Sequence, residues 1–144
     1  MRKKNVSHLW KVLFVMVMLL GTTYSSVNAQ RYQQVKIVNR DGTVSPPNPS
    51  FADMVINFTF SGDYVIWQAP GISYPFKYKY QRTDGTNDVY FIEAYGMGGS
   101  KSYNDKNVMV VSSDWRFINH IVYDNAYQLN YKVVYEKNEG IRYD

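Results

Sequence analysis

The sequence predicts an all-β fold, with a single antiparallel domain of about eight short strands arranged as a sandwich or a small barrel. Aromatic residues make up 17% of the chain, and together with Val and Ile they suit a pleated, half-buried surface. Residues that favour helices are scarce beyond position 30, where Leu129 is the only leucine. Turn-forming residues divide this part into strand-length pieces, which is typical of sandwiches and barrels.

The expected strands follow one another at short spacing. In chain order they are residues 33–39, 54–60, 64–68, 76–80, 88–95, 107–112, 117–123 and 128–136. The first ends at the turn Asp41-Gly42. Three prolines between positions 46 and 49 lack the N–H that a strand ladder needs, so residues 44–49 are expected to form an extended loop. The second and third strands flank Gly62-Asp63, which predicts a β-hairpin.

The middle of the domain has the clearest strand patterns. Residues 76–80 alternate aromatic side chains with lysines, as a half-buried strand does. Residues 88–95 are apolar on both faces, which predicts a central strand covered on both sides. The glycine-rich residues 96–106 are expected to form a long loop before the last three strands. It does not match a phosphate-binding loop, since the order is Gly-Ser-Lys where that motif requires Gly-Lys-Ser/Thr.

The first 29 residues have the pattern of a cleaved secretory signal peptide. A basic head is followed by nine consecutive apolar residues, 12–20, and by a small-residue cleavage site. Nine apolar residues are too few to cross a bilayer, which needs about 20. Cleavage is therefore expected between Ala29 and Gln30. Residues 30–144 would then form a single domain that is secreted or periplasmic and has no membrane span.

Charge and cysteine content exclude several classes of function. The chain has 16 Lys and Arg against 12 Asp and Glu, but four of these cations belong to the predicted leader. The exported domain is therefore close to neutral, and its cations are scattered along the sequence. Nucleic acid is not expected as a partner, because phosphate binding requires clustered cations. The chain has no cysteine, so its stability must come from packing without disulfides.

The sequence indicates no catalytic residue, metal or cofactor. His120 is the only histidine beyond the leader, which excludes a multi-histidine zinc site and Cys-His catalysis. We expect it to be structural or at the surface. Glu93 is the one acid in an apolar strand. We expect it to reach solvent at the strand end or to pair with a lysine or arginine, while a catalytic role as a desolvated carboxylate is the alternative. The Asp84-Gly85 turn lacks the ligand spacing of a calcium loop.

The surplus of aromatic residues is the strongest indication of function. The domain has more aromatic side chains than its core requires, and exposed Tyr and Trp are typical of recognition surfaces. Trp67, Trp115 and Tyr95 are the candidate ligand-binding residues, although for the two tryptophans a role as core anchors is favoured. We therefore expect a non-catalytic binding module for a glycan or a protein. The alternatives are a small carboxylate-based hydrolase using Glu93 and a subunit of a surface assembly that pairs through an edge strand.

Overall fold

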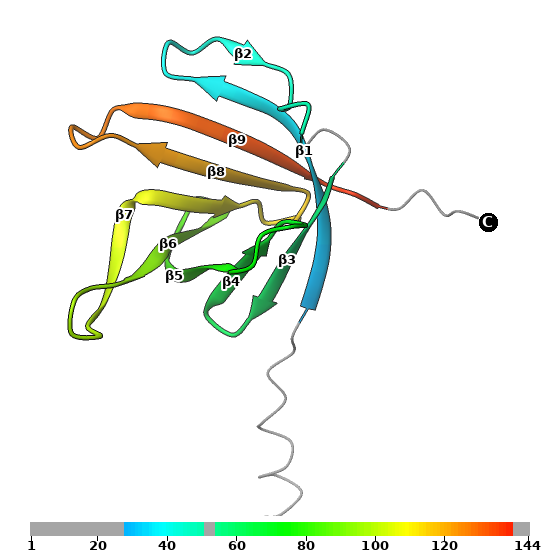
Figure 1. Cartoon of the computed structure of the whole chain (residues 1–144). Coiled ribbons are helices and arrows are strands. Elements are labelled where there is room, and N and C mark those ends of the chain that lie inside the picture. The colour runs from blue at the N-terminus through cyan, green and yellow to red at the C-terminus, as the bar shows by residue number, and fades with distance from the viewer. Residues whose placement is uncertain (1–27, 51–53, 140–144) are drawn as a thin grey trace, which may run out of the picture.

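The computed structural model describes residues 28–50 and 54–139, which form nine β-strands and no helix (Figure 1). The predicted leader up to residue 27 lies outside the described residues. No helix among the described residues could span a membrane. The strands are β1 (Asn28–Asn39), β2 (Val44–Ser45), β3 (Val55–Ser61), β4 (Tyr64–Gln68), β5 (Phe76–Asp84), β6 (Asn87–Tyr95), β7 (Lys101–Val111), β8 (Phe117–Tyr123) and β9 (Leu129–Lys137).

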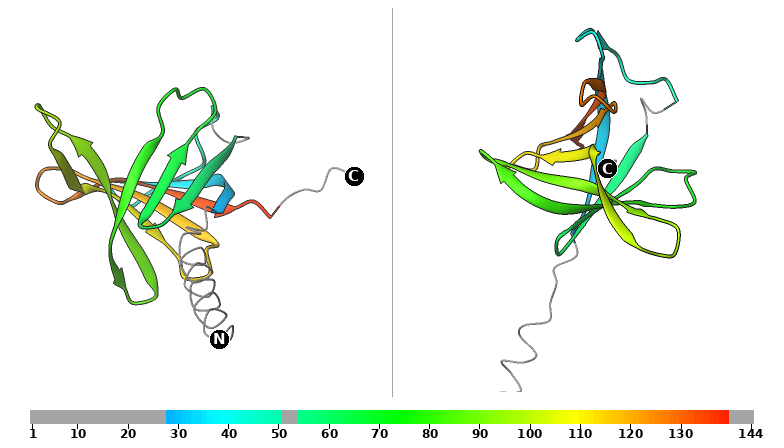
Figure 2. Two further views of the ribbon diagram at one scale, coloured as in Figure 1. Left: turned by 90° about the horizontal axis from the view of Figure 1, so that it is seen from below. Right: turned by 90° about the vertical axis from the view of Figure 1, so that its left-hand side faces the viewer.

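The strands form a closed antiparallel barrel. From β3 to β9 each strand pairs with the next, and β1 pairs both with β3 and with β9, which joins the two ends of the sheet. The short β2 pairs only with β1 and stands outside this ring (Figure 1). Both views of Figure 2 show the sheet curling round on itself. The all-β prediction is confirmed, and of the two architectures it allowed the protein adopts the barrel.

Two segments expected to be loops contain strand. Val44 and Ser45 pair with the end of β1, because the prolines that follow them do not affect their own N–H groups. The glycine-rich segment closes a tight turn, in which the Gly96 N–H donates to the Ser100 carbonyl at 2.8 Å. Gly98 and Gly99 adopt φ of 86° and 76° there, a conformation open to glycine. Strand β7 therefore begins at Lys101, six residues earlier than the sequence pattern indicates.

The barrel interior is filled by side chains. Phe58 lies at its centre and makes edge-to-face contacts with Tyr32 and Tyr135, at ring distances of 5.1 and 5.2 Å. The largest fully buried side chains are Tyr32, Phe58, Ile56, Met109, Ile118 and Val65. Eight strands enclose a space that side chains can fill, and here large aromatic residues fill much of it. The outer surface and the ends of the barrel are therefore the parts that the described strands present to solvent.

A large bulge in β7 shapes the outer surface. The register of β6 and β7 passes from Phe91 opposite Val108 to Ile92 opposite Asn104, so residues 105–107 have no partner in β6. Beyond the bulge, the ends of β6 and β7 form a hairpin that projects from the barrel (Figure 1). Bulges bend the strand that carries them and redirect its side chains. Here the bulge sends Asp105 to the outer surface and Asn107 to a polar cluster described below.

Candidate functional site

The outer surface of β5 to β8 contains a depression of about 330 Å³, called the outer hollow below. Its floor is apolar and consists of Val89 and Phe91 on β6 and Val108 and Val110 on β7. These residues alternate along their strands with Tyr90 and Met109, which belong to the interior core, so one strand pair serves both surfaces. The predicted second cover over β6 is absent from the described part of the chain. Side chains at the rim shield the floor instead.

One wall of the hollow is Tyr127, at the turn between β8 and β9. Its hydroxyl donates a hydrogen bond to Asp105 Oδ2 at 3.0 Å, and the Lys106 ammonium lies 5.1 Å from its ring centroid. Tyr127 has φ of 57°, which costs a non-glycine residue free energy. The Asp124 carboxylate offsets this cost by accepting hydrogen bonds from the N–H groups of Ala126 and Gln128. The turn thus fixes the exposed ring of Tyr127 beside the apolar floor.

The opposite wall is an ion pair on β5. Arg82 Nε lies 3.1 and 3.0 Å from the two carboxylate oxygens of Asp84, and its guanidinium lies 5.8 Å from the Phe91 ring centroid. Both side chains are more than half exposed, at 54% and 58%. Such an exposed pair contributes little to stability. Its donors and acceptors are available to a ligand that enters the hollow.

A second feature of the same outer surface is the lysine–tyrosine face, formed by Tyr64, Lys77, Lys79, Lys101 and Tyr103 around Glu93. Lys101 Nζ lies 2.8 Å from Glu93 Oε1 and Lys77 Nζ 3.8 Å from Oε2. The Tyr64 hydroxyl donates to Glu93 Oε1 at 3.3 Å. Although Glu93 lies on the outside of the barrel, these side chains cover it completely, and its side chain is 0% exposed.

This environment keeps Glu93 ionised. Burial alone would raise the pKa of Glu93, yet the two lysines, above all Lys101, outweigh burial and hold the pKa below its usual range. The hydrogen bond to Glu93 raises the pKa of Lys101 in turn. A general acid needs the opposite shift. Of the two environments expected for Glu93, the structure shows the pairing with a lysine and not the exposure to solvent, because the β6–β7 hairpin brings Lys101 across the carboxylate.

No protein-family model, curated protein or solved structure matches this chain. Its function must be argued from the geometry of these sites.

The three aromatic residues proposed from the sequence lie in three separate places. Trp67 on β4 packs against the interior core and stands 5.3 Å from the Phe76 ring. Tyr95 lies at the end of β6, where it is 67% exposed and its hydroxyl is 3.5 Å from Glu93 Oε2. Trp115 lies in the β7–β8 connection. Of the three, only Tyr95 adjoins either outer feature.

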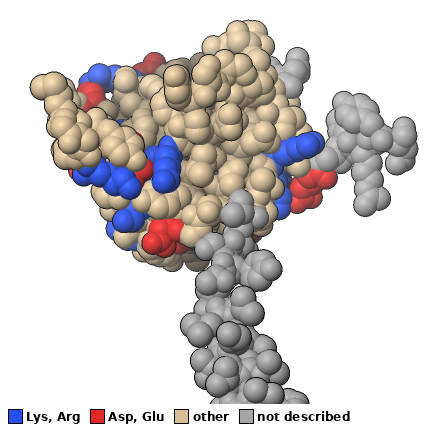
Figure 3. Space-filling view, turned by 60° about the horizontal axis from the view of Figure 1, so that its bottom comes forward, with Lys and Arg blue, Asp and Glu red and all other residues tan. Residues whose placement is uncertain are grey.

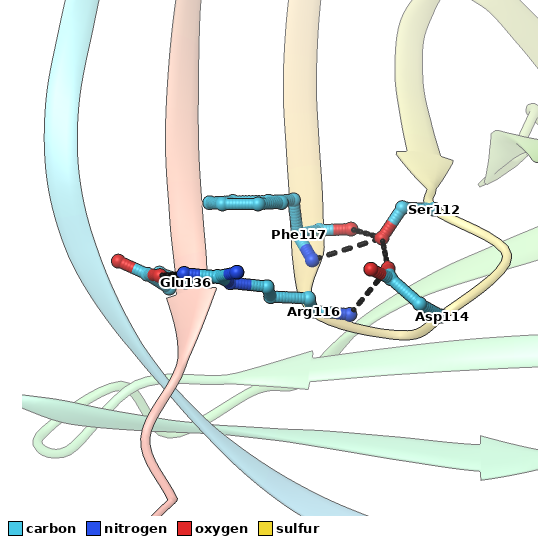
Figure 4. A network of polar contacts seen from close by, with 5 residues as sticks. All are labelled: Ser112, Asp114, Arg116, Phe117 and Glu136. Carbon is cyan, nitrogen blue, oxygen red and sulfur yellow. Dashed lines mark hydrogen bonds and ion pairs between the residues drawn. The ribbon is translucent and has the colours of Figure 1, made fainter.

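Trp115 is held as a cap on one end of the barrel. Its ring lies 4.4 Å from that of Phe60, and its carbonyl accepts a hydrogen bond from the Tyr32 hydroxyl at 2.7 Å. Its φ of 61° is stabilised by the network in Figure 4. There the Asp114 carboxylate accepts from the Ser112 hydroxyl at 2.7 Å and from the Arg116 N–H at 3.0 Å. These contacts give Trp115 a structural role.

A third polar cluster lies toward the inside of the barrel. His120 Nε2 is 2.7 Å from Asn107 Oδ1, and the Tyr78 hydroxyl donates to the same oxygen at 3.1 Å. Since a carbonyl oxygen only accepts, the network places a proton on Nε2 of a neutral imidazole. Burial lowers the pKa of His120 to about 4. The structural role expected for His120 thus agrees with its hydrogen bonds.

The residues of the outer hollow were missed by the sequence analysis. Arg82, Asp105 and Tyr127 come from β5, β7 and the β8–β9 turn, which the sheet and the bulge in β7 bring to one surface. One signal was present in the two apolar faces of β6. A strand of a barrel has only one face in the core, so the second set of apolar residues marks a surface depression. No three potential metal ligands come together in the described ranges 28–50 and 54–139.

Proposed function

We propose that this protein is a non-catalytic binding module that works outside the cytoplasm, secreted or in a periplasm, and holds part of a glycan in the outer hollow. The observation that carries this proposal is the hollow itself, with an apolar floor and a polar, partly charged rim. Concave sites lined by apolar side chains with a few convergent polar groups are the usual binding sites of small ligands. The volume of the hollow lies at the small end of the range for such sites.

A sugar ring fits this combination of groups. Its faces present C–H groups that pack on aromatic side chains, and its edge presents hydroxyls that need donors and acceptors. Phe91 and Tyr127 supply the aromatic surfaces, while Arg82, Asp84 and Asp105 supply charged hydrogen-bonding groups. A rigid barrel holds these groups in place, which reduces the entropy lost on binding.

The alternative of a hydrolase that uses Glu93 finds less support. Its carboxylate is enclosed by Lys101, Lys77 and Tyr64, and its pKa is lowered rather than raised. Glycoside hydrolysis requires one carboxyl group that holds a proton near neutral pH. These contacts favour a structural role for Glu93. They leave a binding role to the surface formed by the side chains that cover it.

Removing the aromatic wall should weaken binding to the hollow. Glycine adopts φ near 57° without strain, so Tyr127→Gly should keep the turn and the fold while it removes the ring. We expect at least about a tenfold loss of affinity, as for a central aromatic contact. Affinity electrophoresis through gels containing dextran, dextran sulfate or polygalacturonate measures it. Tyr74→Ala, an 83% exposed tyrosine outside the hollow, is the matched control. Equal retardation of both variants and the native protein would contradict the proposed site.

The proposal of export makes a separate prediction about processing. Mass spectrometry of the exported protein should find an N-terminus at Gln30, either free or cyclised. Such cleavage removes the pairs that Asn28 and Ala29 form with β3, but Gln30 still pairs with Phe58. The barrel of the processed protein should therefore stay closed. An exported form that retains Met1 would contradict the prediction.

A further inference from the structure

The lysine–tyrosine face is a dense group of positive charges on the outer surface. Lys77 Nζ lies 4.0 Å from the Tyr64 ring centroid and Lys101 Nζ lies 6.0 Å from it. Lys79 Nζ lies 5.2 Å from the ring centroid of Tyr103. Three ammonium groups are thus arranged over two tyrosine rings, which limits the conformations that the lysines adopt. Figure 3 shows one face of the molecule, where lysines and arginines gather toward the left of the view and much of the centre is uncharged.

The internal carboxylate neutralises only part of this charge. Glu93 is the acid in direct contact with the face, and it binds Lys101 far more closely than Lys77. Asp63 raises the pKa of Lys79 less than Tyr103 does. Lys77 and Lys101 are 42% and 43% exposed, so their ammonium groups remain accessible to solvent. The face therefore keeps a positive charge that a ligand can reach.

The face adjoins the outer hollow. Lys79 on β5 lies directly opposite Phe91 on β6, and Phe91 is part of the floor of the hollow. Both side chains lie on the outside of the barrel. A ligand longer than one sugar ring that fills the hollow and extends toward Lys79 would therefore pass from an apolar floor to a row of cations.

We propose that the ligand is an acidic polysaccharide, which places one sugar ring in the outer hollow and a neighbouring carboxylate or sulfate group against Lys79 and Lys77. This inference rests on the function proposed above and adds the chemical class of the ligand. Lys101 is held by its 2.8 Å ion pair with Glu93. The hollow selects the ligand by its shape, and Lys77 and Lys79 select it by its charge.

The test compares acidic and neutral polysaccharides with charge variants of the exported protein. Affinity is measured for polygalacturonate, dextran sulfate and dextran at low and at near-physiological salt. The double variant Lys77→Gln/Lys79→Gln should bind acidic polysaccharide about tenfold more weakly, as expected from the loss of two partly exposed ionic contacts. Its binding should also depend less on salt. The control is Lys36→Gln/Lys132→Gln, which makes the same change of charge on β1 and β9.

The outcomes separate this inference from the proposed function. The inference is supported if the native protein and the Lys36/Lys132 control bind acidic polysaccharide and only the Lys77/Lys79 variant loses this binding. A preference between polygalacturonate and dextran sulfate then identifies the acidic group. Equal affinity for dextran and the acidic polymers would overturn the inference and leave the glycan-binding function standing. An equal loss in both double variants would show unspecific charge attraction and overturn the inference. Binding to none of the three polymers would overturn both.

Discussion

Acid should destabilise the native protein through His120 as the pH falls below 6.5. The pKa of His120 is lowered from 6.5 to about 4 by burial. Above pH 6.5 the imidazole is neutral in both the folded and the unfolded chain. Between pH 6.5 and 4 the unfolded chain binds a proton that the folded protein excludes, so stability falls as the pH falls. The shift corresponds to a loss of about 3 kcal/mol in the free energy of unfolding.

The change His120→Gln should remove this part of the pH dependence. The glutamine amide does not titrate, and it can still donate a hydrogen bond toward Asn107. Urea unfolding of both proteins at neutral pH and at several values down to pH 4 measures the difference. Because His120 is the only histidine after Gln30, NMR of its ring protons gives its pKa directly in the processed protein. Parallel pH profiles for the two proteins, or a ring that titrates near 6.5, would contradict the burial argument.

Loss of the Glu93 charge should destabilise the fold at neutral pH without preventing folding. Glu93→Gln keeps the shape of the side chain but loses the charge-assisted bond to Lys101. Since Lys101 is 43% exposed, it can turn to solvent, which limits the cost to about 1–2 kcal/mol. The matched control is Glu136→Gln, which breaks a surface pair with Arg116 at 3.1 Å and should cost less than about 1 kcal/mol.

The pH dependence of this difference provides a second check. The pKa of Glu93 in the folded protein lies below its ordinary value of 4.5. The stabilisation by its charge is therefore complete above that pH and is lost as the pH falls through the folded-state pKa. The native protein and Glu93→Gln should converge in stability in strong acid. A variant more stable than the native protein at pH 7 would contradict the structural role, because it would show a buried charge held at a cost in stability.

The strands and the fold class could be predicted because they depend on local patterns. The alternation in β5 and the hairpin residues Gly62-Asp63 are visible in a few residues of sequence. Closure of the barrel could not be predicted in the same way, since it depends on the pairing of β1 with β9. The length of β7 was underestimated because a glycine-rich segment is typical of a long loop. Gly98 and Gly99 adopt positive φ instead and close a tight turn.

The candidate sites depended still more on tertiary contacts. The pairing of Glu93 with a lysine was expected, but its burial depends on how the β6–β7 hairpin folds over the outer surface. Asp105 and Tyr127 are 22 residues apart in sequence and meet through a single hydrogen bond. Composition showed a surplus of aromatic residues, yet it could not separate Trp115, which caps the barrel, from Tyr127, which lines the hollow.

The pairing of the first strand with the last also sets the order of events during folding. Tyr32 lies opposite Lys137, so the ring cannot be completed until nearly the whole chain is present. Contacts of such long range are formed late and slowly. Until β9 docks, the partly formed sheet has two open edges and an uncovered aromatic lining, both of which favour aggregation. A chain shortened before β9 should therefore fail to form a protected core, whatever the quality of the earlier strands.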